Sequence, residues 1–258
     1  MHSAPKVDVW LPYRRPRPGA RVRLFCFPFA GGGASVFHDF QEGLPPHVEV
    51  LAVQLPGREG RLAEALVPEM TRLVPMIADS LTPHLTLPFA LLGCSMGARI
   101  AFELARELRR RGVLAGTASA TSRLLHLFAL ACPAPHLSDD DVAHTLPDAA
   151  LIERLRTLGG MREEVLAHRE LMELLLPVFR ADAAVTETYA CADEPPLDAP
   201  LTVIGGLSDA KVDRAALDAW RQHTTGAFAL ALVPGGHLFV QTARARQMVL
   251  AKVARELG

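Results

Sequence analysis

The hydrophobic residues of the chain gather in short runs, separated by longer stretches in which apolar positions recur at helical spacing. The short runs have the length of buried strands and end at glycine, proline or polar residues. They cover residues 22–28, 48–54, 89–92, 124–131, 201–204 and 227–233. Residues 66–84 and 96–111 carry the helical pattern between them. Strands that alternate with helices predict an α/β fold, with a mostly parallel central sheet and helices on both faces.

The alternation stops between residues 137 and 190. Helical patterns at 151–158 and 163–179 follow one another there without a strand-like run, and they are expected to be broken at Gly159-Gly160 and at Pro177. Residues 138–141, Ser-Asp-Asp-Asp, form a helix-start signal. An all-helical stretch between two strands predicts a lid inserted into the fold.

Composition narrows the class of protein. Half of the 258 residues are hydrophobic and the formal net charge is −1, which fits a single domain over 1–258 and argues against a nucleic-acid binder. The first 21 residues hold no signal-type apolar run, and no apolar stretch reaches membrane length. Four widely spaced cysteines read as free thiols in a reducing compartment. We therefore expect a cytoplasmic protein without membrane contact, and the scattered histidines predict no metal site.

Gly93-Cys94-Ser95-Met96-Gly97 stands where a strand gives way to a helix. This is the Gly-x-Ser-x-Gly pattern of a nucleophile elbow, in which small residues on either side of the serine let strand and helix close up. The turn exposes the hydroxyl of Ser95 and leaves the Met96 amide at a helix start, where it can hold an oxyanion. Cys94 is a weaker candidate nucleophile, because it ends the buried strand.

A glycine-rich segment, Phe29 to Ala34, follows the first strand. It lacks both Gly-x-x-x-x-Gly-Lys-Ser/Thr and Gly-x-Gly-x-x-Gly, so a nucleotide-phosphate loop is disfavoured. In hydrolases with a nucleophile elbow, such a loop supplies the second oxyanion donor. We assign that role to the Ala30 amide.

Asp209 and His237 lie in loops directly after the strands at 201–204 and 227–233. The chain order Ser, Asp, His is that of α/β-hydrolases. His237 would remove the proton of Ser95, and Asp209 would hold the imidazole in the required tautomer. Other aspartates are nearby, but only Asp209 ends a strand loop: Asp193, Asp198 and Asp213.

The apolar positions of the predicted insertion exceed a narrow helical stripe. Packing of the insertion on the body explains most of them, and a second apolar face would suit an acyl chain. Met172, Leu176 and Phe179 are the candidate substrate contacts.

Taken together, these residues resemble the type II thioesterases, the free-standing editing enzymes of polyketide and non-ribosomal peptide synthesis. The matching blocks extend over nearly the whole chain: residues 24–32, Gln54-Leu55-Pro56-Gly57-Arg58-Glu59, residues 93–98, Leu176 to Asp182 and Pro234 to Phe239. The block from Pro177 to Asp182 is specific to this group among hydrolases. The resemblance places the family's triad on Ser95, Asp209 and His237, and its oxyanion donors on Ala30 and Met96.

The resemblance also implies a substrate. Such enzymes hydrolyse stalled or wrongly primed acyl groups from the phosphopantetheine arm of acyl or peptidyl carrier proteins, and small acyl thioesters such as acyl-CoA would also react. No cofactor of its own is implied, and we expect a monomer. Two departures bear on partner choice: Cys94 replaces the usual histidine, and residues 131–136 lack the usual arginines.

Two other functions use the same residues differently. A general carboxylesterase or acyltransferase would carry the same triad and would turn over small oxygen esters without a carrier. A binding protein that kept the fold without catalysis is disfavoured, because the serine, acid, histidine and glycine loop are all present.

Overall fold

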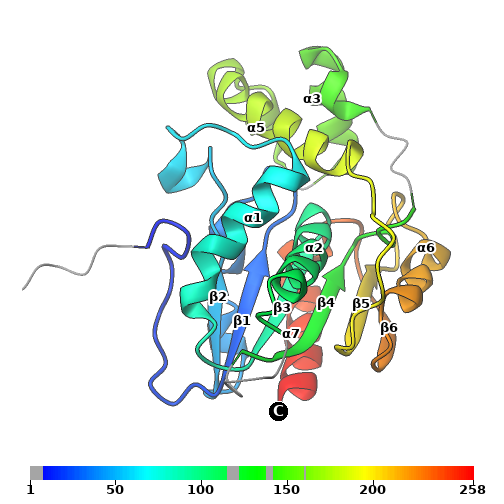
Figure 1. Ribbon diagram of the computed structural model, residues 1–258. Helices are drawn as coiled ribbons and strands as arrows, with labels where there is room; N and C mark the ends of the chain where they lie inside the picture. The colour runs from blue at the N-terminus through cyan, green and yellow to red at the C-terminus, as the bar shows by residue number, and fades with distance from the viewer. Residues whose placement is uncertain (1–7, 115–121, 138–141, 160) are drawn as a thin grey trace, which may run out of the picture.

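A computed structural model describes residues 8–114, 122–137, 142–159 and 161–258 of the chain. Within these ranges the strands form one sheet in the order β2-β1-β3-β4-β5-β6, and every neighbouring pair is parallel (Figure 1). The strands are β1 (Val22–Phe27), β2 (Val48–Ala52), β3 (Phe89–Cys94), β4 (Leu124–Leu130), β5 (Leu201–Gly206) and β6 (Phe228–Val233). The predicted parallel sheet is confirmed.

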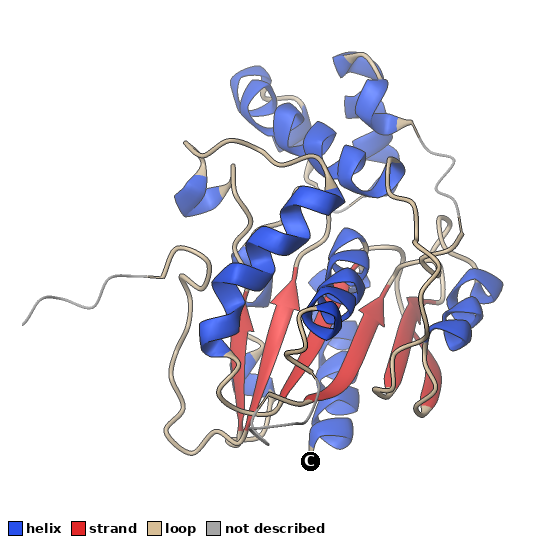
Figure 2. Cartoon of the chain, viewed as in Figure 1, coloured by secondary structure: helices blue, strands red, loops and turns tan. Residues whose placement is uncertain are grey.

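Helices cover the sheet on both faces, as predicted. They are α1 (Met70–Leu81), α2 (Met96–Arg110), α6 (Arg214–Asp218) and α7 (Ala243–Leu257). Alternate residues of β1 point to opposite faces: Phe25 and Phe27 join the core under α1, α2 and α6, whereas Leu24 and Cys26 join the core under α7. Figure 2 shows α1 and α2 in front of the strands and α7 behind them.

Short 3₁₀ turns connect these elements. They are η1 (Ala34–Phe37), η2 (Gln41–Gly43), η3 (Glu59–Arg61), η4 (Thr82–His84), η5 (Ala143–Thr145), η6 (Ala219–His223) and η7 (Phe239–Gln241). The turn η1 begins at the end of the glycine-rich segment, and η3 begins at Glu59, the last residue of the Gln54–Glu59 block.

The helices α3 (Asp148–Leu158), α4 (Glu163–Leu166) and α5 (Arg169–Glu187) lie between β4 and β5 in the chain, where the sequence predicted helices. They stand above the carboxyl ends of the strands (Figure 1). Hereafter we call α3, α4 and α5 the insertion. They share a small core with Ala143 of η5, made of Leu151, Leu155, Leu166, Met172 and Leu176.

The helix boundaries in the insertion differ from the sequence prediction. The segment 163–179 is not one helix, because α4 ends at Leu166 and α5 begins at Arg169, where the His168 ring accepts a hydrogen bond from the Leu171 amide at 3.3 Å. The predicted break at Pro177 is wrong, because α5 passes through Pro177 and continues to Glu187. Pro177 is exposed, so water can satisfy the carbonyl that loses its partner, while the buried face keeps the helix together. The expected helix start at 138–141 lies outside the described residues.

Candidate active site

The strand β3 and the helix α2 meet at Ser95 in a sharp turn. Ser95 has φ 51° and ψ −117°, a conformation that costs non-glycine residues free energy. A Cβ atom on Gly93 would lie 2.0 Å from the Gly97 carbonyl oxygen, and one on Gly97 would lie 2.2 Å from the Phe27 carbonyl oxygen. Only glycine permits these approaches. The Gly-x-Ser-x-Gly pattern therefore forms the elbow that the sequence predicts.

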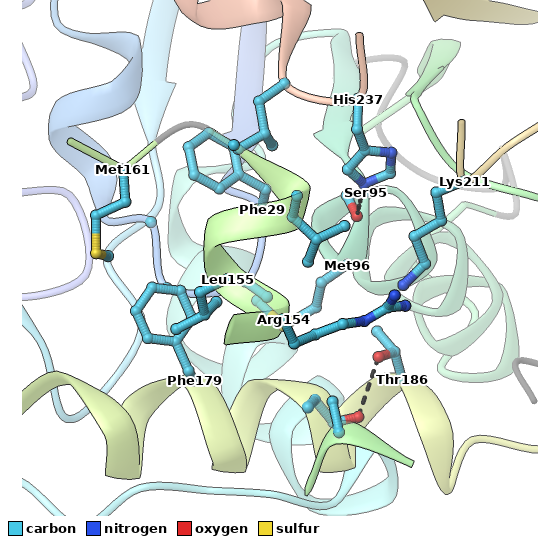
Figure 3. A pocket seen from close by; sticks show the side chains of 18 of the residues that line it. Phe29, Ser95, Met96, Arg154, Leu155, Met161, Phe179, Thr186, Lys211 and His237 are labelled. Carbon is cyan, nitrogen blue, oxygen red and sulfur yellow. Dashed lines mark hydrogen bonds between the residues drawn. The ribbon is translucent and has the colours of Figure 1, made fainter. Parts of the chain in front are cut away.

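The structure brings together the three predicted catalytic side chains from the ends of β3, β5 and β6. His237 Nε2 lies 2.9 Å from Ser95 Oγ, and His237 Nδ1 lies 3.0 Å from Asp209 Oδ2. Figure 3 shows the Ser95 hydroxyl directed at the His237 ring. Hydrogen bonds at both nitrogens fix the orientation of the imidazole, as a base beside a nucleophilic serine requires.

Asp209 is held on both of its oxygens. Oδ1 accepts hydrogen bonds from the amides of Lys211 and Val212 at 2.8 and 3.1 Å, which leaves Oδ2 for His237. Burial alone would raise the pKa of Asp209, but the hydrogen bond and charge of His237, together with the two amides, bring the pKa below its ordinary value. The carboxylate is thus ionised wherever the protein is folded near neutral pH.

The alternative acid and nucleophile are placed elsewhere. Asp213 accepts a hydrogen bond from the Ala216 amide at 2.7 Å and caps α6. The Cys94 side chain is fully buried, and burial raises the pKa of its thiol far above neutrality. Neither residue is in a position to react with a substrate.

The two predicted oxyanion donors face the same space as Ser95. Ala30 and Met96 both line the cavity over the elbow. In the described ranges, no carbonyl or side chain accepts a hydrogen bond from either backbone amide. Neighbouring amides of the glycine-rich loop are used: Gly32 N donates to Phe29 O at 2.9 Å, and Ala34 N donates to Gln54 Oε1 at 2.9 Å.

A cavity of about 370 Å³ opens over the triad, between the sheet and the insertion. That volume lies in the range of sites for small ligands. One side of the cavity is apolar and comes largely from α3 and the segment after it: Leu151, Leu155, Leu158 and Met161. Arg154 and Lys211 add positive charge to the lining (Figure 3).

Only one of the three insertion residues expected to contact substrate lines this cavity. Phe179 does, together with the α3 leucines. Met172 and Leu176 do not line it, because they are buried in the insertion's own core. Their apolar faces turn toward α3 and α4, which the helical pattern of α5 by itself does not reveal.

Sequence reasoning missed a buried ion pair beside the cavity. Arg58 and Asp182 both belong to matched blocks, yet no role was assigned to either side chain. Arg58 Nη1 lies 2.5 Å from Asp182 Oδ2, and Nη2 lies 2.7 Å from Oδ1. Charged residues are seldom buried unless they are paired. The sequence offered one indication of this pair, because an arginine and an aspartate 124 positions apart both lie in blocks that match the family.

The described residues contain neither a metal-ligand cluster nor a membrane-spanning helix. Among the residues with assigned positions, no three His, Cys, Asp or Glu side chains gather as metal ligands. In the same residues, no helix combines the length and apolar character needed to cross a bilayer.

Comparison with known proteins agrees with this geometry. The family model for the thioesterase domain matches residues 22–257. This chain is a thioesterase. The gramicidin S biosynthesis protein GrsT of Aneurinibacillus migulanus is 38% identical over 237 residues, which cover 91% of this chain and 89% of GrsT.

Solved structures agree as well. RedJ, a thioesterase from the prodiginine biosynthetic pathway in Streptomyces coelicolor, aligns with a TM-score of 0.85 and 41% identity over 92% of this chain and 91% of RedJ. The type II thioesterase BorB, from the borrelidin biosynthetic cluster, aligns with a TM-score of 0.82 and 36% identity over 95% of this chain and 96% of BorB. The resemblance to type II thioesterases, the α/β-hydrolase fold and the predicted enzyme class, a thioester hydrolase, are confirmed.

Proposed function

We propose that this thioesterase removes acyl groups from the phosphopantetheine arm of acyl or peptidyl carrier proteins, through an acyl-serine intermediate on Ser95. One observation carries the proposal: the chain of hydrogen bonds from Asp209 through His237 ends at Ser95, which lines a cavity with an apolar side. Relatives named for gramicidin S and prodiginine biosynthesis support the carrier-bound substrate.

The first half-reaction forms the acyl enzyme. Ser95 Oγ attacks the thioester carbonyl carbon while its proton passes to His237 Nε2, and the carbonyl oxygen becomes an oxyanion. The amides of Ala30 and Met96 donate hydrogen bonds to that oxyanion, a contribution worth about 3 kcal/mol for each donor. As the carbon–sulfur bond breaks, His237 returns the proton to the departing sulfur of the pantetheine arm.

The second half-reaction releases the acid. Water takes the place of the pantetheine thiol, gives its proton to His237 and attacks the acyl-serine carbonyl. Collapse of the second tetrahedral intermediate frees the carboxylic acid and returns the proton to Ser95 Oγ. Asp209 stays ionised throughout and stabilises the protonated imidazole. No cofactor takes part in these steps.

The cavity divides the substrate between two regions. The apolar side formed by α3 and Phe179 receives the acyl chain, and the pantetheine arm reaches Ser95 from outside. A carrier protein is therefore expected to dock at the mouth of the cavity, over the carboxyl ends of the strands. Acyl-CoA presents the same arm and is expected to react more slowly, because it lacks the carrier's surface. The protein is proposed to act as a monomer in the cytoplasm.

A general carboxylesterase is the second candidate, because the triad and oxyanion donors also suit oxygen esters. The test compares kcat/KM for one acyl group presented on a carrier protein, on free pantetheine and as a p-nitrophenyl ester. We expect the carrier-bound thioester to be preferred over the ester by at least about tenfold, a difference of about 1.4 kcal/mol in transition-state binding. Equal or higher kcat/KM for the ester would favour the carboxylesterase.

A further inference from the structure

The buried pair Arg58–Asp182 joins three parts of the molecule. Asp182 lies on α5 of the insertion, and Arg58 lies in the loop after β2. The third part is the glycine-rich loop after β1, because Gly31 N donates a hydrogen bond of 2.7 Å to Asp182 Oδ2. Arg58 Nη1 also lies 3.3 Å from the Gly32 carbonyl oxygen. Both charged side chains are buried.

The helix α5 contacts Gly31 with two side chains one turn apart. Residues at i and i+3 share one face of a helix, and here Phe179 and Asp182 both meet the same residue of the loop. A Cβ atom on Gly31 would lie 1.9 Å from Phe179 Cε1, so the ring occupies the place of a side chain. Gly31 also has φ +77°, which other residues adopt at a cost. The loop therefore fits α5 in one conformation.

The direction of one amide constrains its neighbour in such a loop. The Gly31 N–H points at the carboxylate of the insertion, and the Gly32 N–H returns to the Phe29 carbonyl oxygen. With these two amides committed, the peptide before Gly31 is held so that the Ala30 amide remains for the cavity. An unheld glycine-rich loop would sample many conformations, most of them with this donor turned away.

The negative charge of the Asp182 carboxylate, by itself, would repel an oxyanion that forms nearby. The bidentate contact with Arg58 neutralises Asp182 and leaves its oxygen as a strong hydrogen-bond acceptor. The pair is thereby suited to fix geometry without adding net charge near Ser95.

We infer that Asp182, neutralised by Arg58, is a positioning residue that holds the glycine-rich loop so that the Ala30 amide donates to the oxyanion. The inference rests on the proposed function only in assigning that role to Ala30. It also makes the insertion part of the catalytic apparatus, because the acceptor that orders the loop is carried on α5.

The test compares Asp182→Ala with the neutral pair Arg58→Gln/Asp182→Asn. Removal of Asp182 alone leaves the buried Arg58 guanidinium unpaired, which destabilises the fold. The concentration of active enzyme is therefore determined by titrating Ser95 with a fluorophosphonate, and kcat is expressed per titrated serine. The substrate is p-nitrophenyl acetate. We expect D182A to lose about 100-fold in kcat, the lower range for an absent oxyanion donor, with little change in KM. The neutral pair keeps an oxygen for the Gly31 amide and should stay within about tenfold of the wild type.

Glu64→Gln is the matched control. It removes another bidentate arginine–carboxylate pair, with Arg61 in the segment that follows Arg58, and neither residue lines the cavity. The Glu64 carboxylate is half-exposed, so its loss leaves no uncompensated buried charge of the kind expected at Asp182. Its kcat should equal that of the wild type. The pH profile of kcat/KM should be the same in all variants, because the triad is untouched.

Two results would overturn the inference. One is a kcat per titrated serine in D182A within about threefold of the wild type, and the other is an equal loss in D182A and the neutral pair. Neither bears on the proposed function, which fails separately if the wild type is not labelled at Ser95.

Discussion

Ser95 shows how a single residue combines strain with function. Its backbone conformation is held because α2 packs closely against β1 and β3 at the two glycines of the elbow, while the Ser95 amide donates to the Leu130 carbonyl oxygen at 2.7 Å. Strain of this kind persists only where the surroundings over-determine it. The serine hydroxyl is thereby presented to His237 without any movement of the backbone.

Gly97→Ala tests this account of the elbow. Alanine ordinarily stabilises a helix relative to glycine by about 1 kcal/mol, but here its Cβ would meet the Phe27 carbonyl oxygen. We expect the free energy of unfolding to fall by about 3 kcal/mol or more, measured by urea denaturation. Gly60→Ala is the control, since a Cβ there meets no atom within 4 Å, and its effect should stay within about 0.5 kcal/mol. A stabilised G97A would contradict the close approach.

Asp209→Asn tests the assignment of the acid. The amide cannot accept from His237 Nδ1–H in the same way as the carboxylate, so the wrong tautomer is favoured and kcat should fall by about 10³- to 10⁴-fold with little change in KM. Asp213→Asn serves as the matched control, because asparagine also caps helices and the residue precedes α6 without lining the cavity. Comparable losses in the two variants would reject Asp209 as the partner of His237.

Chain order and loop position were sufficient to predict the triad residues, since the ends of parallel strands meet at one edge of a sheet. Asp182 and Arg58 could not be assigned in the same way. Their partnership depends on how α5 docks on two loops, and no spacing in the sequence encodes that distance. Both residues lie in blocks that match the family, but the blocks alone do not indicate what either side chain does.

At the scale of elements, both α3 and α5 line the cavity, and the leucines among the lining residues of these two helices all belong to α3. The sequence pattern indicated apolar positions in both helices but could not show which of them face the triad. Met172 and Leu176 went to the insertion's own core, while Leu158 of α3 lines the cavity and stays partly exposed. The predicted helix boundaries were wrong for a related reason, because tertiary packing stabilises α5 as one helix on both sides of Pro177.

Leu158→Trp tests the role of α3 in accepting the acyl chain. The larger ring would fill part of a cavity of about 370 Å³ and shorten the space for the chain. We expect kcat/KM for a decanoyl thioester to fall at least about tenfold while that for an acetyl thioester changes less than about threefold. Leu174→Trp, on the exposed face of α5, should leave both values unchanged. Equal effects of L158W on both chain lengths would exclude α3 from the acyl site.

At the scale of the whole molecule, the parallel sheet unites residues that are distant in the chain. Strand order brings the ends of β3, β5 and β6 to one edge, and the insertion covers that edge (Figure 1). The same sheet buries His126 of β4, whose Nε2 lies 2.8 Å from Thr202 Oγ1 of β5. Burial lowers the pKa of His126 to about 4, so the folded protein resists protonation there.

This buried histidine predicts how stability depends on pH. Between the ordinary pKa of 6.5 and about 4, the unfolded chain binds a proton at His126 that the folded protein does not. The free energy of unfolding should therefore fall as the pH drops through this window, by about 3 kcal/mol for this residue. His126→Gln should reduce the fall when urea denaturation is compared at pH 7 and 4.5. Because His223 titrates in the same window, only the difference between variant and wild type reports on His126, and identical slopes would refute the assignment.

The central claim is that Ser95 removes acyl groups from carrier proteins, and intact-protein mass spectrometry tests it most directly. Carrier proteins loaded with acetyl, propionyl and longer acyl groups would be incubated with the wild type and with Ser95→Ala. We expect the acyl mass to disappear with the wild type alone, leaving the free phosphopantetheine arm on the carrier. Persistence of every acyl group with a wild type that still hydrolyses small esters would contradict the claim.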